Sequence, residues 1–348
     1  TFSKIHFQNC IDAYSGPSLV IADEVHGMGT DNQLHMLNCG HSFEYRLGLS
    51  ATFERWFDQS GTKRLEEYFC KTVYKFELKE ALEAGILVPY EYYPELVELQ
   101  DDEREDYINL TRKIGQSLSK NNNIDENTAA KHLLLKRARL IAGAKNKFVR
   151  LSELLDEQNK STSGIRQTLI YCGSGIVETD IEEPDPCENR YIDVISALLC
   201  NRNLKFGIYV AETEIAQRLH LQSSLANGQI SALVAIRCLD EGVDIPPVRT
   251  AYILASSRNP RQFIQRRGRV LRQHKASGKK SAKIYDFIVV PPSDLDQETW
   301  RIERRLLMNE LRRVIEFSRL SRNEGTTLKR LRQLRETYQL LGFDGEGL

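Results

Sequence analysis

The sequence predicts an α/β protein with two separate parallel-sheet segments, a helical connector between them and helices at the C-terminal end. In two parts of the chain, short apolar runs alternate with amphipathic stretches, which is the pattern of parallel βα units. Between about residues 101 and 158 the apolar positions follow helical spacing instead. Residues 294–341 are charged, with arginines three and four positions apart, which favours helices.

The first α/β segment contains three predicted strands. Residues 18–22 form an apolar run that ends at Asp23, residues 45–49 form a second run, and residues 71–76 a third. Residues 78–84 are amphipathic and predict a helix, whereas residues 90–99 are expected to form an extended connector. Tyr90, Tyr92 and Tyr93 in this connector are expected to be core residues rather than a surface on which bases stack.

The second α/β segment begins near Gln167. Predicted strands cover residues 168–172, 205–210, 232–236, 250–255 and 283–290, with helical stretches between them, so a doubly wound parallel sheet is expected. The polar residues 120–123 are expected to form a loop. The expected divisions of the chain are therefore residues 1–88, 89–145, 146–292 and 293–348.

Composition narrows the class of protein. The 348 residues are 41% hydrophobic and carry no formal net charge, so the chain is expected to bury sizeable cores without a global field that attracts nucleic acid or membranes. No apolar run approaches the roughly 20 residues of a membrane span, which argues against a membrane partner. The seven cysteines and seven histidines show no metal-binding spacing, which favours reduced thiols and a cytoplasmic location.

The first chemical motif is Asp23-Glu24-Val25-His26, at the end of an apolar strand. Ligands of open α/β sheets gather beyond the carboxyl ends of strands. There, one acid can hold Mg²⁺ while its neighbour orients or deprotonates an attacking water. Taken alone, the short motif fits a turn that carries two solvated acids better than it fits a catalytic site.

The second motif is Gly48-Leu49-Ser50-Ala51-Thr52, which follows another predicted strand. Ser50 and Thr52 could hydrogen-bond carboxylates and relay position between two parts of the molecule. They could equally form the N-cap of a helix that starts near Phe53.

The third motif contains Gly242 and Asp244, in a run from Cys238 to Pro246 that follows the predicted strand 232–236. Gly242 would permit close approach of the backbone, and Asp244 could accept a hydrogen bond from a ribose hydroxyl or orient an arginine. An ordinary loop before the next strand is the alternative.

The fourth motif, residues 265–272, reads Gln-Arg-Arg-Gly-Arg-Val-Leu-Arg after Asn259-Pro260, which resemble the N-cap and first residue of a helix. Arg269 and Arg272 lie three positions apart and so share a helical face. Residues 258–283 contain no acid, so these guanidinium groups favour an anionic partner, and phosphate suits their geometry. A solvated surface helix is the alternative.

In this order and spacing, the four motifs resemble motifs II, III, V and VI of superfamily-2 DEAD/DEAH-type helicases. Residues 168–174 lie where motif IV would be. The residues of these motifs are more similar to those of the XPB-like and restriction-helicase branch than to those of DEAD-box RNA helicases. The resemblance covers roughly residues 18–292 and implies two RecA-like lobes, the first of them incomplete.

The resemblance also implies cofactors, partners and roles. ATP and Mg²⁺ would be the cofactors, and nucleic acid the partner, DNA rather than RNA. Asp23 would coordinate Mg²⁺ and Glu24 would polarise the hydrolytic water, while Arg269 and Arg272 would act as arginine fingers. The remaining residues would bind nucleotide or couple hydrolysis to movement: His26, Ser50, Ala51, Thr52, Gly242, Asp244 and Gln265.

One family motif is absent from the sequence: no G-x-x-x-x-G-K-[ST] loop occurs in the 348 residues. Backbone N–H groups of that loop cradle the phosphates and its lysine reaches the β and γ oxygens. Without it, the isolated chain is expected neither to bind ATP tightly nor to hydrolyse it. An N-terminal lobe segment, in the same chain or another, is expected to supply the loop.

Two other interpretations of the chain remain open at this point. It could be a catalytically silent nucleic-acid-binding module, or a translocase on double-stranded DNA that never separates the strands. The tail, residues 293–348, could present a basic helical face to a phosphate backbone. Alternatively it could pack on the second lobe through the apolar residues Leu306, Leu307, Leu311, Ile315 and Leu320. The basic residues at issue are Arg304, Arg305, Arg312, Arg313, Arg319, Arg322, Arg330 and Arg332.

Overall fold

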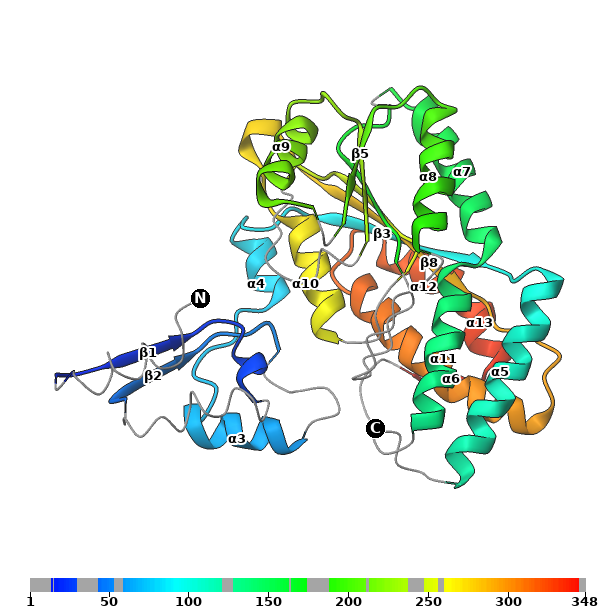
Figure 1. Ribbon diagram of the computed structural model, residues 1–348, viewed down its shortest axis with the longest axis horizontal. Helices are drawn as coiled ribbons and strands as arrows, with labels where there is room; N and C mark the ends of the chain where they lie inside the picture. Colours follow the sequence, from blue (N-terminus) through cyan, green and yellow to red (C-terminus); the bar gives the residue numbers. More distant parts are fainter. Residues whose placement is uncertain are drawn as a thin grey trace. The chain divides into compact units, whose positions relative to one another are not determined.

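The computed structural model (Figure 1) describes residues 14, 16–29, 43–52, 59–120, 128–162, 164–173, 188–210, 213–236, 247–255 and 260–343. The chain divides into two compact units, residues 1–76 and residues 77–348.

The first unit contains a small parallel sheet. Strands β1 (Leu19–Ala22) and β2 (Tyr45–Gly48) pair in register from Leu19 opposite Tyr45 to Ala22 opposite Gly48. The 3-10 helix η1 (Val25–Gly29) follows β1, and helix α3 (Gln59–Phe69) packs against both η1 and β2. A small core of Ala22, Val25 and Leu65 holds these elements together. The first two predicted strands are thus confirmed.

The third predicted strand of this unit, residues 71–76, is wrong. These residues form neither strand nor helix, and Val73, Tyr74 and Phe76 are 79%, 69% and 51% exposed. The run has the residue types of a strand, but a strand forms only where a neighbouring strand satisfies its backbone groups.

The second unit is built on a six-stranded, fully parallel sheet with the strand order β3-β8-β7-β4-β6-β5. Figure 1 shows this sheet with helices packed around it. The five strands predicted for this segment are confirmed, and β4, β6 and β7 are buried throughout. Their bounds are Thr168–Tyr171 for β4, Phe206–Tyr209 for β5, Ala232–Ala235 for β6, Thr250–Ile253 for β7 and Ala282–Val289 for β8.

Strand β3 (Tyr90–Val97) corrects the prediction of an extended connector over residues 90–99. It pairs with β8 along its whole length, from Tyr90 opposite Ala282 to Val97 opposite Val289. It lies at the edge of the sheet, where Pro94, which has no N–H to donate, is tolerated. Tyr90 and Tyr92 are fully buried, as expected of core residues.

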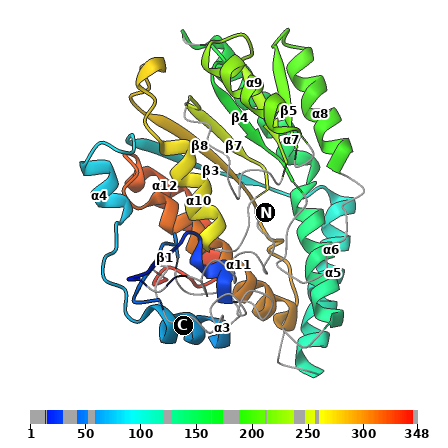
Figure 2. The same ribbon diagram turned by 60° about the vertical axis from the view of Figure 1, so that its left-hand side comes forward.

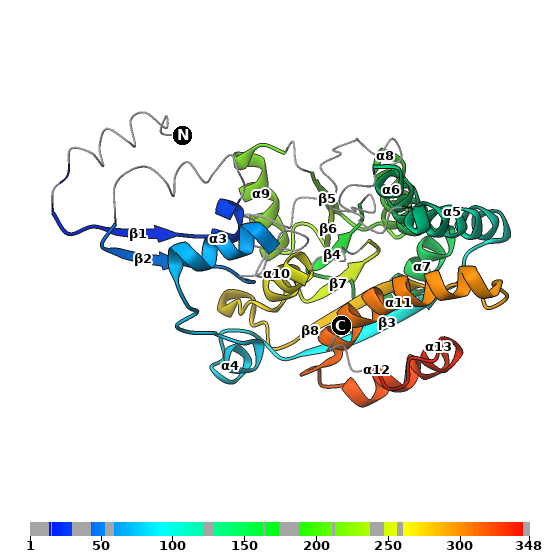
Figure 3. The ribbon, with the colours of Figure 1, turned by 90° about the horizontal axis from the view of Figure 1, so that it is seen from below.

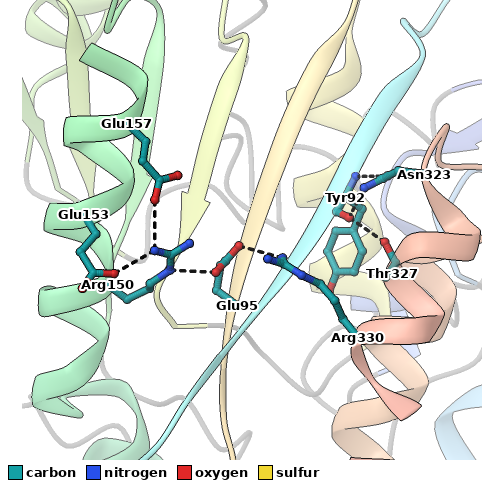
Figure 4. Close-up of polar contacts among 8 residues, drawn as sticks. All are labelled: Tyr92, Glu95, Arg150, Glu153, Glu157, Asn323, Thr327 and Arg330. Atoms are coloured by element: carbon teal, nitrogen blue, oxygen red, sulfur yellow. Dashed lines mark hydrogen bonds and ion pairs between the residues drawn. The ribbon is translucent and has the colours of Figure 1, made fainter. Parts of the chain in front are cut away.

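The outer edge of β3 is covered by the short helix α12 (Glu324–Arg330). The Asn323 side chain accepts a hydrogen bond from the Tyr92 N–H at 2.8 Å and donates one to the Tyr92 carbonyl at 2.9 Å. The Thr327 hydroxyl donates to the same carbonyl (Figure 4). A covered edge cannot recruit a further strand.

Helices cover both faces of the sheet. One core cluster joins the sheet to α9 (Ile215–Ala226), α10 (Pro260–Leu271) and α11 (Gln297–Ser318), and a second joins it to α7 (Lys145–Lys160) and α8 (Glu188–Cys200). Figure 2 shows α10 beside α11, and Figure 3 shows α11 running along β3 and β8. The remaining helices are α4 (Leu78–Glu83), α5 (Asp101–Lys120), α6 (Thr128–Ala142), α13 (Arg332–Thr337) and the 3-10 helix η2 (Lys275–Ser277).

The helices predicted for residues 78–84, for residues 101–158 and for the tail are confirmed by α4, by α5 to α7 and by α11 to α13. The predicted loop begins at Lys120, which still ends α5, and residues 121–127 lie outside the described residues. Leu306, Leu307, Leu311 and Ile315 are buried, so α11 packs against the unit, as one of the two alternatives for the tail predicted. The prediction is wrong for Leu320, which lies beyond the end of α11 and is 44% exposed. Within the described part of the chain, no helix is long and apolar enough to cross a membrane.

Candidate nucleotide site

The first two predicted motifs meet at the carboxyl end of the small sheet. Asp23 and Glu24 follow β1, and Ser50 follows β2 two residues after its end. The backbone joins the two segments: the Val25 N–H donates to the Leu49 carbonyl at 2.9 Å, and the Leu49 N–H to the Ala22 carbonyl at 2.8 Å. Parallel pairing thus brings together residues that are about 25 positions apart in the sequence.

His26 connects these two motifs through its side chain. The imidazole is only 5% exposed, and its Nδ1 lies 3.0 Å from Ser50 Oγ and 3.4 Å from Glu24 Oε2. The Ser50 hydroxyl donates its proton to the Thr52 carbonyl at 2.6 Å. Since that proton is engaged, His26 Nδ1 must carry the hydrogen that points to Ser50. The ring is therefore fixed in one tautomer and one orientation.

Asp23 and Glu24 are both exposed, so their carboxylates can reach a ligand in solution. The Glu24 N–H donates to Asp23 Oδ1 at 2.9 Å, and Glu24 adopts a left-handed backbone conformation with φ of 49°. A non-glycine residue in this region is strained, and such strain concentrates at functional sites. Ala51, which lies between Ser50 and Thr52, is also exposed.

This set of oxygen donors fits Mg²⁺. Protein sites hold Mg²⁺ with one or two carboxylates, and waters and substrate phosphates complete the octahedron. The described residues contain no group of three or more His, Cys, Asp or Glu side chains that could enclose a metal. A carboxylate pair of this kind would leave positions on the metal for waters and substrate phosphates.

The fourth predicted motif lies on α10, which begins at Pro260 as predicted; Asn259, Gly242 and Asp244 lie outside the described residues. Arg272 is exposed, and Gln265 and Arg269 are half-buried. Arg269 lies in the last turn of α10, and Arg272 directly follows the helix.

Two other arginines of this motif have structural contacts that the sequence analysis missed. Arg266 is 4% exposed, and its guanidinium carbon lies 4.1 Å from the centre of the Tyr171 ring. Arg267 is 2% exposed and donates to the Glu316 carbonyl at 2.7 Å and to Glu316 Oε1 at 2.8 Å. The distance from Arg266 to the Tyr171 ring is that of a cation–π contact, and the distance from Arg267 to the Glu316 carboxylate is that of a charge-assisted hydrogen bond.

The absence of acids in residues 258–283 therefore does not leave Arg267 without a carboxylate, because α11 provides Glu316. The spacing of apolar residues in the sequence could have predicted that these arginines face inward. Phe263, Val270 and Leu271 are apolar and lie three to five positions from Arg266 and Arg267, which places both arginines on the inward face of the helix.

Many arginines of the tail also have partners within the protein. Arg313 is buried and pairs with Asp286, Arg330 pairs with Glu95, and Arg332 pairs with Glu336. Arg304 donates to the carbonyls of Tyr338 and Gln339. Figure 4 shows Glu95 between Arg330 and Arg150 of α7. These contacts favour a packed tail over a continuous basic face.

Comparison with known proteins identifies part of the second unit. Residues 146–274 match the family model of the helicase conserved C-terminal domain. A curated relative, the DNA 3'-5' translocase XPB2 of Sulfurisphaera tokodaii, is 26% identical over 287 residues, which cover 82% of this chain and 61% of the relative. The chain thus spans about three fifths of the relative's length.

Two solved structures are similar to this chain, each with a TM-score below 0.5. The helicase domain of Pyrococcus furiosus Hef has a TM-score of 0.47 at 14% identity, covering 86% of this chain and 77% of that one. The Type ISP restriction-modification enzyme LlaBIII has a TM-score of 0.49 at 15% identity, covering 94% of this chain and 23% of that one. The family match assigns residues 146–274 of the second unit, rather than the whole chain, to the helicase conserved C-terminal domain.

Proposed function

We propose that this chain is part of an ATP-driven motor that moves along DNA, and that its two units are RecA-like lobes of that motor. The observation that carries the proposal is the cluster of Glu24, His26 and Ser50. It joins an acid that can activate water to a second motif at the same edge of the sheet. A nucleic-acid-binding module without catalysis would need no such arrangement.

In this proposal Asp23 holds the Mg²⁺ of MgATP, and Glu24 orients and deprotonates the water that attacks the terminal phosphate. When bound, Mg²⁺ neutralises the charge that develops on the transferred phosphoryl group. His26 and Ser50, with Ala51 and Thr52 beside them, transmit changes at Glu24 to the loop after β2.

The remaining proposed roles belong to the second unit. Arg269 and Arg272 stabilise charge on the phosphates, while Gln265, Gly242 and Asp244 bind near the nucleotide. Arginine fingers of this kind contribute about 10³ to 10⁵ in rate to related phosphoryl transfers.

DNA is the proposed track because the curated relative is named a DNA translocase. That name also favours a second candidate, movement along double-stranded DNA without separation of its strands. The two candidates differ in outcome. A motor that only translocates displaces the third strand of a triplex but leaves a forked duplex intact, whereas a helicase separates the fork as well.

We further propose that the phosphate-binding loop is supplied from outside these 348 residues. The apolar side chains of the small sheet support this: Leu19 is 55% exposed, Ile21 58%, Tyr45 59% and Leu47 38%. A row of exposed apolar residues on one face of two adjacent strands is characteristic of a sheet that packs against a further element.

The test compares two proteins: the chain alone, and an extended form, meaning the chain together with the sequence encoded immediately upstream of residue 1. ATP binding and DNA-stimulated ATP hydrolysis are measured for both. The expected result is hydrolysis by the extended form alone, abolished by Glu24→Gln. DNA-stimulated hydrolysis by the chain alone would contradict the proposed source of the loop.

A further inference from the structure

At the helix end that carries Arg269 and Arg272, three of the last four backbone carbonyls accept hydrogen bonds from donors outside the arginine motif. The last carbonyls of an α-helix have no partner within the helix, yet those of residues 269 to 272 each accept a hydrogen bond. The Arg269 carbonyl accepts from the Arg272 N–H at 3.4 Å, and the Leu271 carbonyl from the Val88 N–H at 2.8 Å. The Lys279 ammonium donates to the other two, the carbonyls of Val270 at 2.5 Å and Arg272 at 2.9 Å.

Lys279 reaches this position through a tight turn. His274 accepts a hydrogen bond from the Ser277 N–H, and Gly278 closes η2 in a left-handed conformation with φ of 63°. The turn folds Lys279 back under α10, where its side chain is 4% exposed. Burying an ammonium is costly unless its charge is compensated. The negative end of the helix dipole and the two carbonyls provide that compensation.

The second donor, Val88, belongs to the segment that leads from the first unit into the sheet. Besides the Val88 N–H, the Ile86 carbonyl takes part, accepting from the Gln273 N–H at 3.3 Å. Leu87 and Arg272 form an isolated antiparallel bridge. Residues 86–88 are therefore joined to both sides of Arg272 by backbone hydrogen bonds.

Residues 71–77, which precede this segment, are all exposed and form no helix or strand. Helix α4 follows, with Leu78 and Leu82 packed on the core of the second unit. The helix ends at Glu83, and Gly85, two residues later, has a left-handed φ of 68°. The connection between the two units is therefore exposed and irregular over residues 71–77, and residues 86–88 attach its backbone to the end of the arginine helix.

We propose that Lys279 is a positioning residue for Arg269 and Arg272, and that Lys279 and residues 86–88 form a clamp that opens as one unit. The clamp couples the connection between the two units to the arginine helix, so that tension on residues 78–88 shifts Arg272. The effect of the clamp on catalysis rests on the proposed function. The existence of the clamp does not depend on that function.

Hydrogen–deuterium exchange on the chain alone tests the clamp without any need for ATP. Lys279→Met removes the ammonium while keeping an unbranched apolar side chain, and Lys280→Met is the matched control, because the adjacent Lys280 is exposed. We expect Lys279→Met to speed exchange about tenfold in residues 268–275 and also in residues 84–90. That factor corresponds to about 1.4 kcal/mol. Lys280→Met is expected to leave both segments unchanged.

Exchange in residues 84–90 is the informative readout, since a purely local role of Lys279 would alter only its own neighbourhood. The proposal is overturned if Lys279→Met behaves like Lys280→Met, or if it affects residues 268–280 alone. Should Lys279→Met fail to fold, hydrogen exchange in the unsubstituted chain still tests the proposal. Equal protection of residues 84–90 and 268–275 supports a common opening, and many-fold faster exchange of residues 84–90 refutes it.

Discussion

The Arg137–Glu303 pair links α6 to α11 in the interior of the second unit. Their side chains are 4% and 1% exposed, and the Arg137 guanidinium lies 2.7 Å from Glu303 Oε1. The hydroxyl of Tyr107, on α5, donates to the same carboxylate oxygen at 2.7 Å. Because every charge here is compensated within the protein, loss of either partner leaves an isolated charge in the interior.

We therefore predict that Glu303→Gln destabilises the chain by about 3–5 kcal/mol, since it leaves the Arg137 charge uncompensated. Chemical denaturation measures the loss. The exposed pair of Arg332 and Glu336, with side chains 73% and 46% exposed, provides the control. Glu336→Gln is expected to cost less than about 0.5 kcal/mol. Equal effects of the two substitutions would show that burial does not set the cost.

Lys147 is a second buried charge at the residue scale. It is 1% exposed and donates to the Leu254 carbonyl at 2.6 Å, just beyond β7. Burial lowers the pKa of its ammonium to about 8, although the carboxylates of Glu310 and Asp286 oppose that shift. The side chain lines a cavity together with Arg137, Glu303 and Arg313.

This shifted pKa predicts a rise in stability with pH. Below pH 8 Lys147 is protonated in both states, so the cost of burying its charge is fully present. Between pH 8 and its unfolded value near 10.5, the folded state loses the proton first and stability increases. The expected gain is about 2 kcal/mol between pH 8 and pH 10.

Denaturation of the unsubstituted chain and of Lys147→Met at several pH values measures this gain. The difference in unfolding free energy between the two proteins should grow in favour of the unsubstituted chain as the pH rises. A difference that is independent of pH would mean that Lys147 keeps its ordinary pKa. The titration of tyrosines does not affect this difference, because both proteins contain the same tyrosines.

At the scale of elements, the C-terminal helices form part of the core of the second unit. Leu307, Leu311, Val314 and Phe317 of α11 belong to the same buried cluster as Tyr90 of β3 and Leu271 of α10. The Tyr90 hydroxyl lies 2.8 Å from the carbonyl oxygens of both Phe317 and Arg319, at the end of α11, and its single proton serves these two acceptors. The family match, by contrast, ends at residue 274.

Truncation after residue 292 tests this role. We predict that the shortened chain loses cooperative unfolding, because removal of α11 exposes the apolar cluster and the edge of β3. Near-ultraviolet circular dichroism and thermal melting provide the measurement. A truncated protein with the same sharp transition as the full chain would show that the tail is dispensable for the fold.

Most strands could be predicted from the sequence because each is a short apolar run with little local ambiguity. Strand β3 could not, because its tyrosines and glutamates interrupt the apolar pattern and its partner β8 lies about 190 residues further on. Residues 71–76 show the opposite failure. Their residue types favour a strand, but whether a strand forms depends on a neighbour that local sequence does not reveal.

The candidate site was predictable to a similar degree. The joining of Asp23, Glu24 and His26 to Ser50 follows from two predicted strands that prove to be parallel neighbours. The burial of Arg267 against Glu316 could not be foreseen, because it depends on the path of a helix 49 positions away. Motif spacing thus identifies the residues, whereas packing decides which of them point to a ligand.

At the scale of the whole molecule, the proposed chemistry is shared between the two units. The first carries exposed carboxylates at the end of a small sheet, and the second carries arginines on a helix whose end is fixed by Lys279 and Val88. In the proposed function, neither set hydrolyses a triphosphate by itself. The central claim is therefore that Glu24 and Arg272 act on the same phosphate.

DNA-stimulated ATP hydrolysis by the extended form tests that claim most directly, in the unsubstituted protein, Glu24→Gln, Arg272→Ala and the double variant. The account predicts that each single substitution lowers kcat by about 10³ or more. The double variant should be little slower than the slower single one, because both residues serve one transition state. Hydrolysis at the unsubstituted rate by either single variant would contradict the account.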